Sequence, residues 1–342
     1  MSRDLYARMR PLLFRLDPET AHLRTLDLLR FFGASAAGRS ALRFLFSPRH
    51  TDDPVEVLSL KFSNRIGLAA GYDKDGRALR GLACLGFGHI EVGTVTRQPQ
   101  SGHPRPRIFR VTENKALINR MGFPSRGALA VSSELQRGRP QDAVIGVNLG
   151  KGAATPLEAA AEDYCALVET FGPLADYLTI NVSSPNTLGL RRLQARDHLE
   201  GLLSEVTRAR DLVTGPPRPL LVKLSPDLDP AELEDALAAV VRAGVEGVVA
   251  TNTTTARPGV DSSLGAQPGG LSGAPLFPLA LEQVRRAARW GGGRIAVIGC
   301  GGVSSRDQVQ AMLDAGADLV QLFTALVYQG PRVVQSLLAR SD

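Results

Sequence analysis

The sequence predicts a (β/α)8 barrel, an α/β fold of the TIM-barrel type, preceded by a small N-terminal helical extension. From about residue 64 onward, eight apolar runs of strand length alternate with stretches of helical periodicity. The length of 342 residues fits one large barrel with an extension. A doubly wound sheet shares this alternation, but no GxGxxG motif follows the first predicted strand.

The predicted elements follow in chain order. The strands are 66–70, 90–94, 143–149, 177–182, 220–224, 247–251, 295–299 and 319–323. The helices between them include 76–85, 156–171, 198–213, 230–243, 278–290, 305–315 and 331–340. Four of these helices carry a proline in their predicted first turn, where a missing N–H is tolerated: Pro156, Pro230, Pro278 and Pro331. Two insertions are long enough to be lids or binding loops: 97–131, which contains several prolines, and 253–275, which is rich in Gly, Ser and Pro and lacks periodicity.

Composition limits the classes of function. Residues 1–50 hold nine Arg and four Asp or Glu, so +5 of the net charge of +6 belongs to this segment. A basic groove for nucleic acid across the body is therefore not expected, whereas a local anionic partner is. Cys84, Cys165 and Cys300 are few and widely spaced, which favours reduced thiols over a disulfide framework or a zinc site. No apolar run of about 18 residues appears, and arginines interrupt residues 1–15, so we expect neither a spanning helix nor a signal peptide.

Residues 1–46 precede the barrel and predict two amphipathic helices. Asp17-Pro18 starts the second helix, with Asp as N-cap and Pro at the first helical position. Apolar faces and a basic balance suit a helix pair that lies in a membrane interface. The same pattern suits a cap packed on the barrel, and the sequence leaves both interpretations open.

Polar residues and glycines occupy the carboxyl ends of all eight predicted strands, where barrels of this type build their active sites. These ends are 70–74, 93–96, 148–152, 181–187, 223, 251–253, 299–302 and 323–324. Gly299–Gly302 and Thr324 fall where such barrels bind phosphate, after the seventh and eighth strands. Only five of the 40 basic residues are lysines, and two of these, Lys74 and Lys223, stand at strand ends. They predict a need for a compact ammonium that Arg cannot supply.

The densest polar stretch is Asn181-Val-Ser-Ser-Pro-Asn-Thr187 after the fourth predicted strand. Alone, it would fit an Asx or Ser turn that caps a helix; among the other strand ends it predicts a ligand-binding loop. No His, Asp and Glu cluster suits a metal, and no Ser-His-Asp set is evident. The pattern therefore favours a phosphorylated cofactor that supplies the chemistry, with no metal.

Six motifs, in order along the chain, resemble the dihydroorotate dehydrogenase family: 69–76 AAGYDKDG, 93–96 GTVT, 119–123 NRMGF, 181–187 NVSSPNT, 251–253 TNT and 270–273 GLSG. The preface LDPETAH at 16–22 resembles the extension of the membrane-associated, quinone-reducing class 2 enzymes. Ser184 stands where class 2 members use Ser and the cytosolic class 1 enzymes use Cys. The resemblance implies dihydroorotate oxidation to orotate in pyrimidine biosynthesis.

The resemblance also implies FMN as cofactor and assigns residues to it: Ala70, Gly71, Tyr72, Asp73, Lys74, Thr94, Asn148, Asn181, Lys223, Thr251, Gly273, Gly301, Gly302, Phe323 and Thr324. The substrate residues it implies are Lys74, Asn119, Arg120, Met121, Gly122, Phe123, Asn181, Asn186, Asn252 and Thr253. Ser184 would remove the C5 proton while hydride leaves C6 for flavin N5. Thr187 would hold a water on the proton route, Phe123 would wall that route, and Lys74 would supply charge.

For the second half-reaction the resemblance implies a membrane quinone. Residues 1–46 would form the quinone-access and membrane segment, held to an anionic surface at the cytoplasmic face of the cell membrane, and residues 47–342 the FMN barrel. His22 and Arg110 match polar positions on the quinone route, although each could equally be a capping or salt-bridged residue. Relatives often carry Tyr where this chain has Phe323.

Three alternative functions were weighed against this one. A cytosolic flavin barrel that uses fumarate or NAD is disfavoured by Ser184 and by residues 1–46. A phosphate-binding isomerase without a redox cofactor would need a carboxylate or His at a strand end, and only Asp73 is available. A non-catalytic binding module gives no reason for eight convergent polar strand ends.

Overall fold

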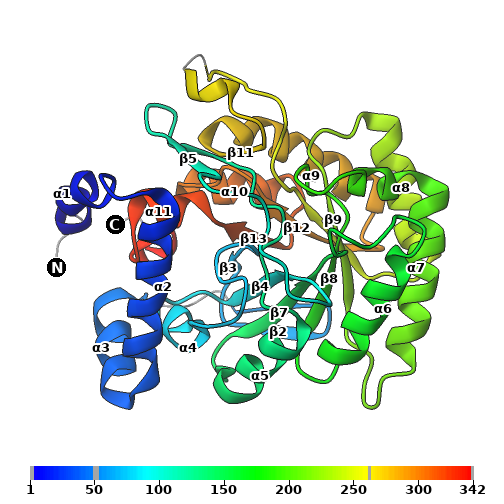
Figure 1. Cartoon of the computed structure of the whole chain (residues 1–342), viewed down its shortest axis with the longest axis horizontal. Coiled ribbons are helices and arrows are strands. Elements are labelled where there is room, and N and C mark those ends of the chain that lie inside the picture. The colour runs from blue at the N-terminus through cyan, green and yellow to red at the C-terminus, as the bar shows by residue number, and fades with distance from the viewer. Residues whose placement is uncertain (1–3, 49–53, 261–262, 340–342) are drawn as a thin grey trace.

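The computed structural model describes residues 4–48, 54–260 and 263–339, and its centre is a closed barrel of eight parallel strands (Figure 1). Around the barrel the strands follow the order β10-β12-β13-β3-β4-β7-β8-β9. Their bounds are β3 Ile66–Leu68, β4 His89–Val95, β7 Val144–Leu149, β8 Tyr177–Asn181, β9 Leu220–Leu224, β10 Gly247–Ala250, β12 Ala296–Cys300 and β13 Leu319–Leu322. The predicted barrel is therefore confirmed, strand by strand.

Helices cover the outside of this barrel (Figure 1). They are α4 Leu79–Ala83, α5 Ala128–Gly138, α6 Ala160–Phe171, α7 Arg196–Asp211, α8 Pro230–Arg242, α9 Phe277–Gly291, α10 Arg306–Asp314, α11 Thr324–Gln329 and α12 Val333–Leu338, with short 3-10 turns η1 Leu190–Gln194, η2 Ser263–Ala266 and η3 Ala274–Leu276. Pro230 and Pro278 occupy first turns as predicted. Pro156 and Pro331 do not, because α6 begins only at Ala160 and α12 at Val333.

A short hairpin plugs the amino end of the barrel. Strands β1 Val55–Val57 and β2 Leu60–Phe62 pair antiparallel. Val57 and Phe62 pack with Leu221 and Ile298 in a cluster separate from the main core. Side chains therefore fill this end, and the opposite, carboxyl end is left for a ligand.

The two insertions were predicted as lids or binding loops, and the structure adds strands to both that the sequence did not predict. They pair with each other in a three-stranded antiparallel sheet, order β11-β6-β5, formed by β5 Ile108–Val111, β6 Ala116–Asn119 and β11 Gly270–Gly273. Val111, Ile118 and Leu271 form its own small apolar core. Each strand has only four residues, too few to show a period, yet the sheet brings Asn119 beside Gly270.

The N-terminal extension contains three helices, where two were predicted. They are α1 Asp4–Leu13, α2 Pro18–Ala34 and α3 Ala36–Phe46. Asp17 caps α2 as expected. The overlooked break is Ser35, whose extended backbone ends α2 and whose hydroxyl accepts a hydrogen bond from the N–H of Gly38 (3.0 Å) at the start of α3.

The extension packs on the barrel while it exposes apolar side chains. Helix α2 contacts α4, and Leu26 and Leu29 of α2 are buried. Gly33 of α2 lies so close to α4 that a Cβ added to Gly33 would stand 2.6 Å from the backbone nitrogen of Gly81. Among the described residues, seven of the ten exposed large apolar side chains belong to this segment: Met9, Leu12, Leu16, Leu28, Phe31, Phe32 and Phe44. No described helix is long and apolar enough to cross a membrane.

Candidate active site

One cavity of about 740 Å³ extends from the carboxyl ends of the barrel strands to the helices of the extension. At its polar end it is lined by residues of the predicted site, among them Lys74, Asn181 and Lys223. At its apolar end it is lined by Leu16, Leu28 and Phe32 of the extension, all of which are exposed. The cavity therefore reaches the surface among the apolar side chains of α1–α3.

Three strand ends meet in a buried amide and hydroxyl cluster. Thr94 of β4 donates its hydroxyl to Asn148 Oδ1 of β7 (2.6 Å), and Asn181 Nδ2 of β8 donates to both of these side chains (3.0 Å each). Because Glu91 accepts a hydrogen bond from Asn148 Nδ2 (2.8 Å), the Asn148 oxygen is fixed toward Thr94 and Asn181. The cluster is a rigid polar floor for the cavity.

The two predicted lysines both line the cavity. Lys223, at the end of β9, is buried, and its nearest described partner is the thiol of Cys300, 4.0 Å from Nζ. A buried ammonium with so weak a partner calls for an electron-rich ligand. Lys74 donates from Nζ to the carbonyl of Gly71 (2.7 Å). Burial lowers the pKa of Lys74 to about 8, although the carboxylates of Glu19 and Asp75 oppose this shift.

Glycines shape the other side of the cavity. Gly273 and Gly302 both have positive φ, and an added Cβ on Gly302 would lie 2.7 Å from the carbonyl oxygen of Gly273. Gly301 is equally crowded, with Ala280 Cβ at 2.7 Å. No larger residue fits these positions, so the backbone itself forms the wall here. This cavity-lining backbone fits the predicted phosphate cradle of a nucleotide-like cofactor.

Ser184 lies on the loop after β8 and lines the cavity, with 5% of its surface exposed. Its Oγ accepts a hydrogen bond from the N–H of Asn186 (3.2 Å). Asn186 in turn donates Nδ2 to the carbonyl oxygen of Asn119 (3.1 Å). Ser184 and Asn186 of this strand end and Asn119 of the first insertion thus lie together.

The remaining predicted residues divide into two groups. Those that line the cavity are Ala70, Gly71, Tyr72, Met121, Gly122, Phe123, Thr251, Asn252, Thr253, Gly301, Gly302, Phe323 and Thr324. Four predicted residues do not line it: Asp73, Arg120, Asn148 and Thr187.

Three of these four side chains have other partners. Asp73 accepts from the N–H groups of Arg77 (2.9 Å) and Ala78 (2.7 Å) just ahead of α4. Arg120 donates to Gln267 Oε1 (2.8 Å) and lies over the ring of Phe109, and Asn148 belongs to the amide cluster described above. Any contribution of these three to a ligand site is therefore made through neighbouring residues.

The predicted quinone residues lie at the extension side. The ring of His22 in α2 packs edge-on against Tyr72 (4.8 Å between centroids), and Tyr72 packs against Phe323 (5.7 Å). Burial, together with the charge of Lys74, lowers the pKa of His22 to about 3, so the imidazole is neutral at pH 7. Arg110 donates to the carbonyl oxygens of Phe14 (3.2 Å) and Leu16 (2.8 Å), which is the capping role left open above, and it also lines the cavity.

Sequence reasoning missed several residues of the site. Cys300, Gln321 and Ser272 line the cavity, and Ser272 Oγ lies 2.9 Å from Thr324 Oγ1. Cys300 directly follows a predicted strand, Gln321 lies within one, and Ser272 belongs to the motif at 270–273, so each position carried a signal. Glu19 was missed entirely: buried at 5% exposure, it binds Arg107 and joins α2 to the first insertion.

Within the described ranges, no group of three or more His, Cys, Asp or Glu side chains is arranged to hold a metal ion.

Comparisons with known proteins show to which family the chain belongs. The family model described as dihydroorotate dehydrogenase matches residues 54–340. The relative named dihydroorotate dehydrogenase (quinone) from Roseiflexus sp. strain RS-1 is 46% identical over 337 residues, covering 98% of this chain and 92% of its own. The relative of the same name from Paraburkholderia phymatum is 46% identical over 339 residues, covering 98% of this chain and 96% of its own. The crystal structure of DHODH from Eimeria tenella in complex with ferulenol has a TM-score of 0.87 at 33% identity, covering 95% of this chain and 92% of that one. The chain therefore belongs to the dihydroorotate dehydrogenase family, and within it to the quinone-dependent class 2.

Proposed function

We propose that this chain oxidises dihydroorotate to orotate in pyrimidine biosynthesis and passes the electrons to a membrane quinone. The observation that carries the proposal is the single cavity with a polar end at the barrel strands and an apolar end in the extension. The relatives are named dihydroorotate dehydrogenase (quinone), which gives a polar substrate for the polar end and an apolar acceptor for the apolar end. An acceptor such as fumarate or NAD would need a polar entrance instead.

The cofactor that fits best is FMN. Gly273, Gly301 and Gly302 offer cavity-lining backbone for its phosphate, and the buried Lys223 offers a positive charge for the electron-rich edge of the ring. Ala70, Gly71, Thr251 and Thr324 line the space between them. When bound, FMN would accept hydride from the substrate and give up the electrons in the second half-reaction.

The substrate side is assembled from amides, one cation and one hydroxyl. Asn119, Asn186 and Asn252 present amides that complement the ring of dihydroorotate, and Lys74 complements its carboxylate. Ser184 is the base for the C5 proton. A serine hydroxyl is a poor base, so it depends on exact placement and on donors that polarise the neighbouring carbonyl. Thr187 does not line the cavity, so its water-holding role requires a solvent path that passes behind Ser184.

The quinone side is the apolar end, and Tyr72, neutral His22 and Arg110 are among the polar residues that line the cavity there. The exposed apolar side chains of α1–α3, with +5 of net charge in residues 1–50, suit peripheral attachment to an anionic membrane, on the cytoplasmic face. We expect no nucleic-acid partner, because the net charge outside residues 1–50 is close to neutral.

The test is anaerobic addition of dihydroorotate to the purified protein, followed by a long-chain quinone. Flavin absorbance should bleach with the first addition and return with the second. Protein that stays colourless after titration with FMN, or yellow protein that dihydroorotate does not bleach, would contradict the proposal. Return of colour with fumarate or NAD but not with quinone would assign the acceptor to the alternative class.

A further inference from the structure

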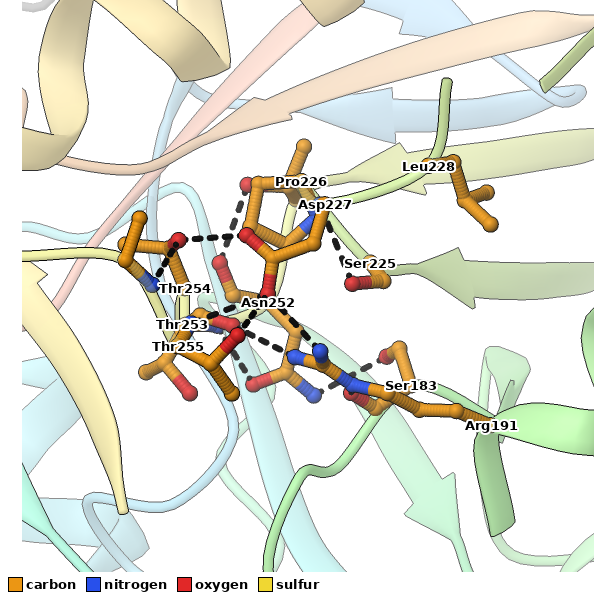
Figure 2. Close-up of polar contacts among 12 residues, drawn as sticks. Ser183, Arg191, Ser225, Pro226, Asp227, Leu228, Asn252, Thr253, Thr254 and Thr255 are labelled. Atoms are coloured by element: carbon orange, nitrogen blue, oxygen red, sulfur yellow. Dashed lines mark hydrogen bonds and ion pairs between the residues drawn. The ribbon is translucent and has the colours of Figure 1, made fainter. Parts of the chain in front are cut away.

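Arg191, a residue of η1 outside the predicted site, connects three loops at the carboxyl end of the barrel (Figure 2). Its Nε donates to the carbonyl oxygen of Ser183 (3.1 Å), after β8. One terminal nitrogen donates to Asp227 Oδ2 (2.7 Å), after β9, and the other to the carbonyl oxygen of Thr253 (3.0 Å), after β10. A planar guanidinium with donors fixed in a fork is suited to such a three-way contact.

Asp227 completes the connection from the loop after β9. Besides Arg191, it accepts hydrogen bonds from the hydroxyl of Thr254 and from the N–H (2.9 Å) and hydroxyl (3.0 Å) of Thr255. Burial alone would raise the pKa of Asp227, but these hydrogen bonds outweigh it and hold the pKa below its usual value. The carboxylate is therefore ionised at neutral pH, and about a fifth of its side chain is exposed.

The connected backbone positions adjoin the residues that handle substrate. Ser183 directly precedes Ser184, and its hydroxyl accepts from Asn252 Nδ2 (2.9 Å). Thr253 lines the cavity, and Thr254 next to it forms a bridge with Leu271 of β11 (N to O, 3.1 Å). Arg191 and Asp227 do not line the cavity themselves. They touch the far side of the segments that form its wall.

We propose that the Arg191–Asp227 pair is a positioning device for proton removal: it fixes the loop with Ser184 against the loop with Asn252 and Thr253. The inference rests on the proposed function, because it assumes that Ser184 takes the C5 proton. Such a base needs its oxygen held to within a fraction of an ångström, and a displacement of about 1 Å costs on the order of 10²-fold in rate. Neither residue contacts substrate, so both act through their neighbours.

The test compares Arg191→Ala, Arg191→Lys and Asp227→Asn with a matched control. The control is the ion pair between Arg196 and Asp235 (3.2 Å), which joins α7 to α8 and leaves about half of each side chain exposed. Arg196→Ala removes the same chemical group five positions away, without touching a strand-end loop. Stopped-flow measurement of flavin reduction by dihydroorotate is the main assay, on yellow protein of verified flavin content.

Arg191→Ala should slow flavin reduction by about 10²-fold, and Arg191→Lys and Asp227→Asn should each slow it by less than this but by clearly more than about threefold. The deuterium isotope effect at C5 should increase more than that at C6, because only the base is displaced. Flavin content and the rate of reoxidation by quinone should stay unchanged, and Arg196→Ala should match wild type throughout.

Reduction within about threefold of wild type in Arg191→Lys and Asp227→Asn overturns the inference, even if Arg191→Ala fails to fold. An equal loss in Arg196→Ala also overturns it. If dihydroorotate does not reduce the wild-type flavin, the proposed function fails instead, so the two failures are distinguishable.

Discussion

We expect Glu19→Ala to release α2 from the barrel, because Glu19 is the buried end of an ion pair between the extension and the first insertion. Its carboxylate accepts from Arg107 Nε (3.0 Å), from Arg107 Nη2 (2.8 Å) and from Arg105 Nη2 (2.9 Å). Glu19 is 5% exposed and Arg107 is 7% exposed. The substitution leaves the Arg107 guanidinium buried, with the carbonyl oxygens of Ser101 and His103 as its remaining acceptors.

Removing one partner of a buried ion pair typically costs about 3–5 kcal/mol. At about 1.4 kcal/mol for each factor of ten, the lower end of this range corresponds to a roughly 10²-fold increase in local opening of α2. Hydrogen exchange of the α2 amides, around Leu26 and Leu29, measures this opening directly. The exchange rates of amides in the barrel strands should not change, because these strands are hydrogen-bonded to one another and not to α2.

The matched control is Asp27→Asn. Asp27 pairs with Arg77 (2.8 Å), which also joins α2 to the barrel, but its side chain is 54% exposed. An exposed pair contributes about 0–1 kcal/mol, so exchange should rise by less than about fivefold. If Glu19→Ala raises the exchange rate of the α2 amides no more than Asp27→Asn does, burial does not strengthen the Glu19–Arg107 ion pair and the reasoning fails.

Three further predictions concern flavin reduction, orotate binding and membrane attachment. Ser184→Ala should keep flavin and orotate binding but slow flavin reduction by roughly 10²–10⁴-fold, and a near-normal rate would show that another group takes the proton. Burial lowers the pKa of Lys74 to about 8, so its side chain is charged below that pH and neutral above it. The Kd for orotate, measured by titration, should therefore stay constant up to about pH 7.5 and rise above pH 8. A Kd that does not rise would show that Lys74 does not contact the carboxylate of the ligand. Phe44→Glu, at a side chain 86% exposed, should weaken flotation with anionic liposomes, whereas Leu212→Glu at an 81% exposed site on the barrel should not.

The barrel was predictable from the sequence because its signals are local. Each strand is a short apolar run that ends in polar residues, and the alternation with helices repeats eight times. The polar strand ends then meet at one edge of the closed barrel, which is why Asn181 and Lys223 could be brought together from spacing alone. The glycines at 301 and 302 were likewise identifiable from their position after a strand.

What the sequence did not predict depends on contacts between distant segments. The sheet β11-β6-β5 pairs strands of two insertions that lie about 150 positions apart, and each strand is too short for a period. The Glu19–Arg107 and Arg191–Asp227 pairs also join distant segments, and nothing in the local pattern separates these arginines from the many others in the chain. The break at Ser35 was a local signal, a helix N-cap, that the apolar periodicity on both sides obscured.

Besides its contacts with α4 and the first insertion, the extension meets the barrel at the segment after β3, and on the proposed function this contact links the two ends of the cavity. In this segment Gly71, Tyr72 and Lys74 all line the cavity: Lys74 donates to the carbonyl oxygen of Gly71, and the ring of Tyr72 packs against His22 of α2. Glu19, one helical turn before His22, is close enough for its charge to raise the pKa of Lys74. Helix α2 therefore contributes both to the apolar wall and to the electrostatics of the polar end. A loosened extension should on this account weaken substrate binding as well as quinone access, because the two ends share the segment from Gly71 to Lys74.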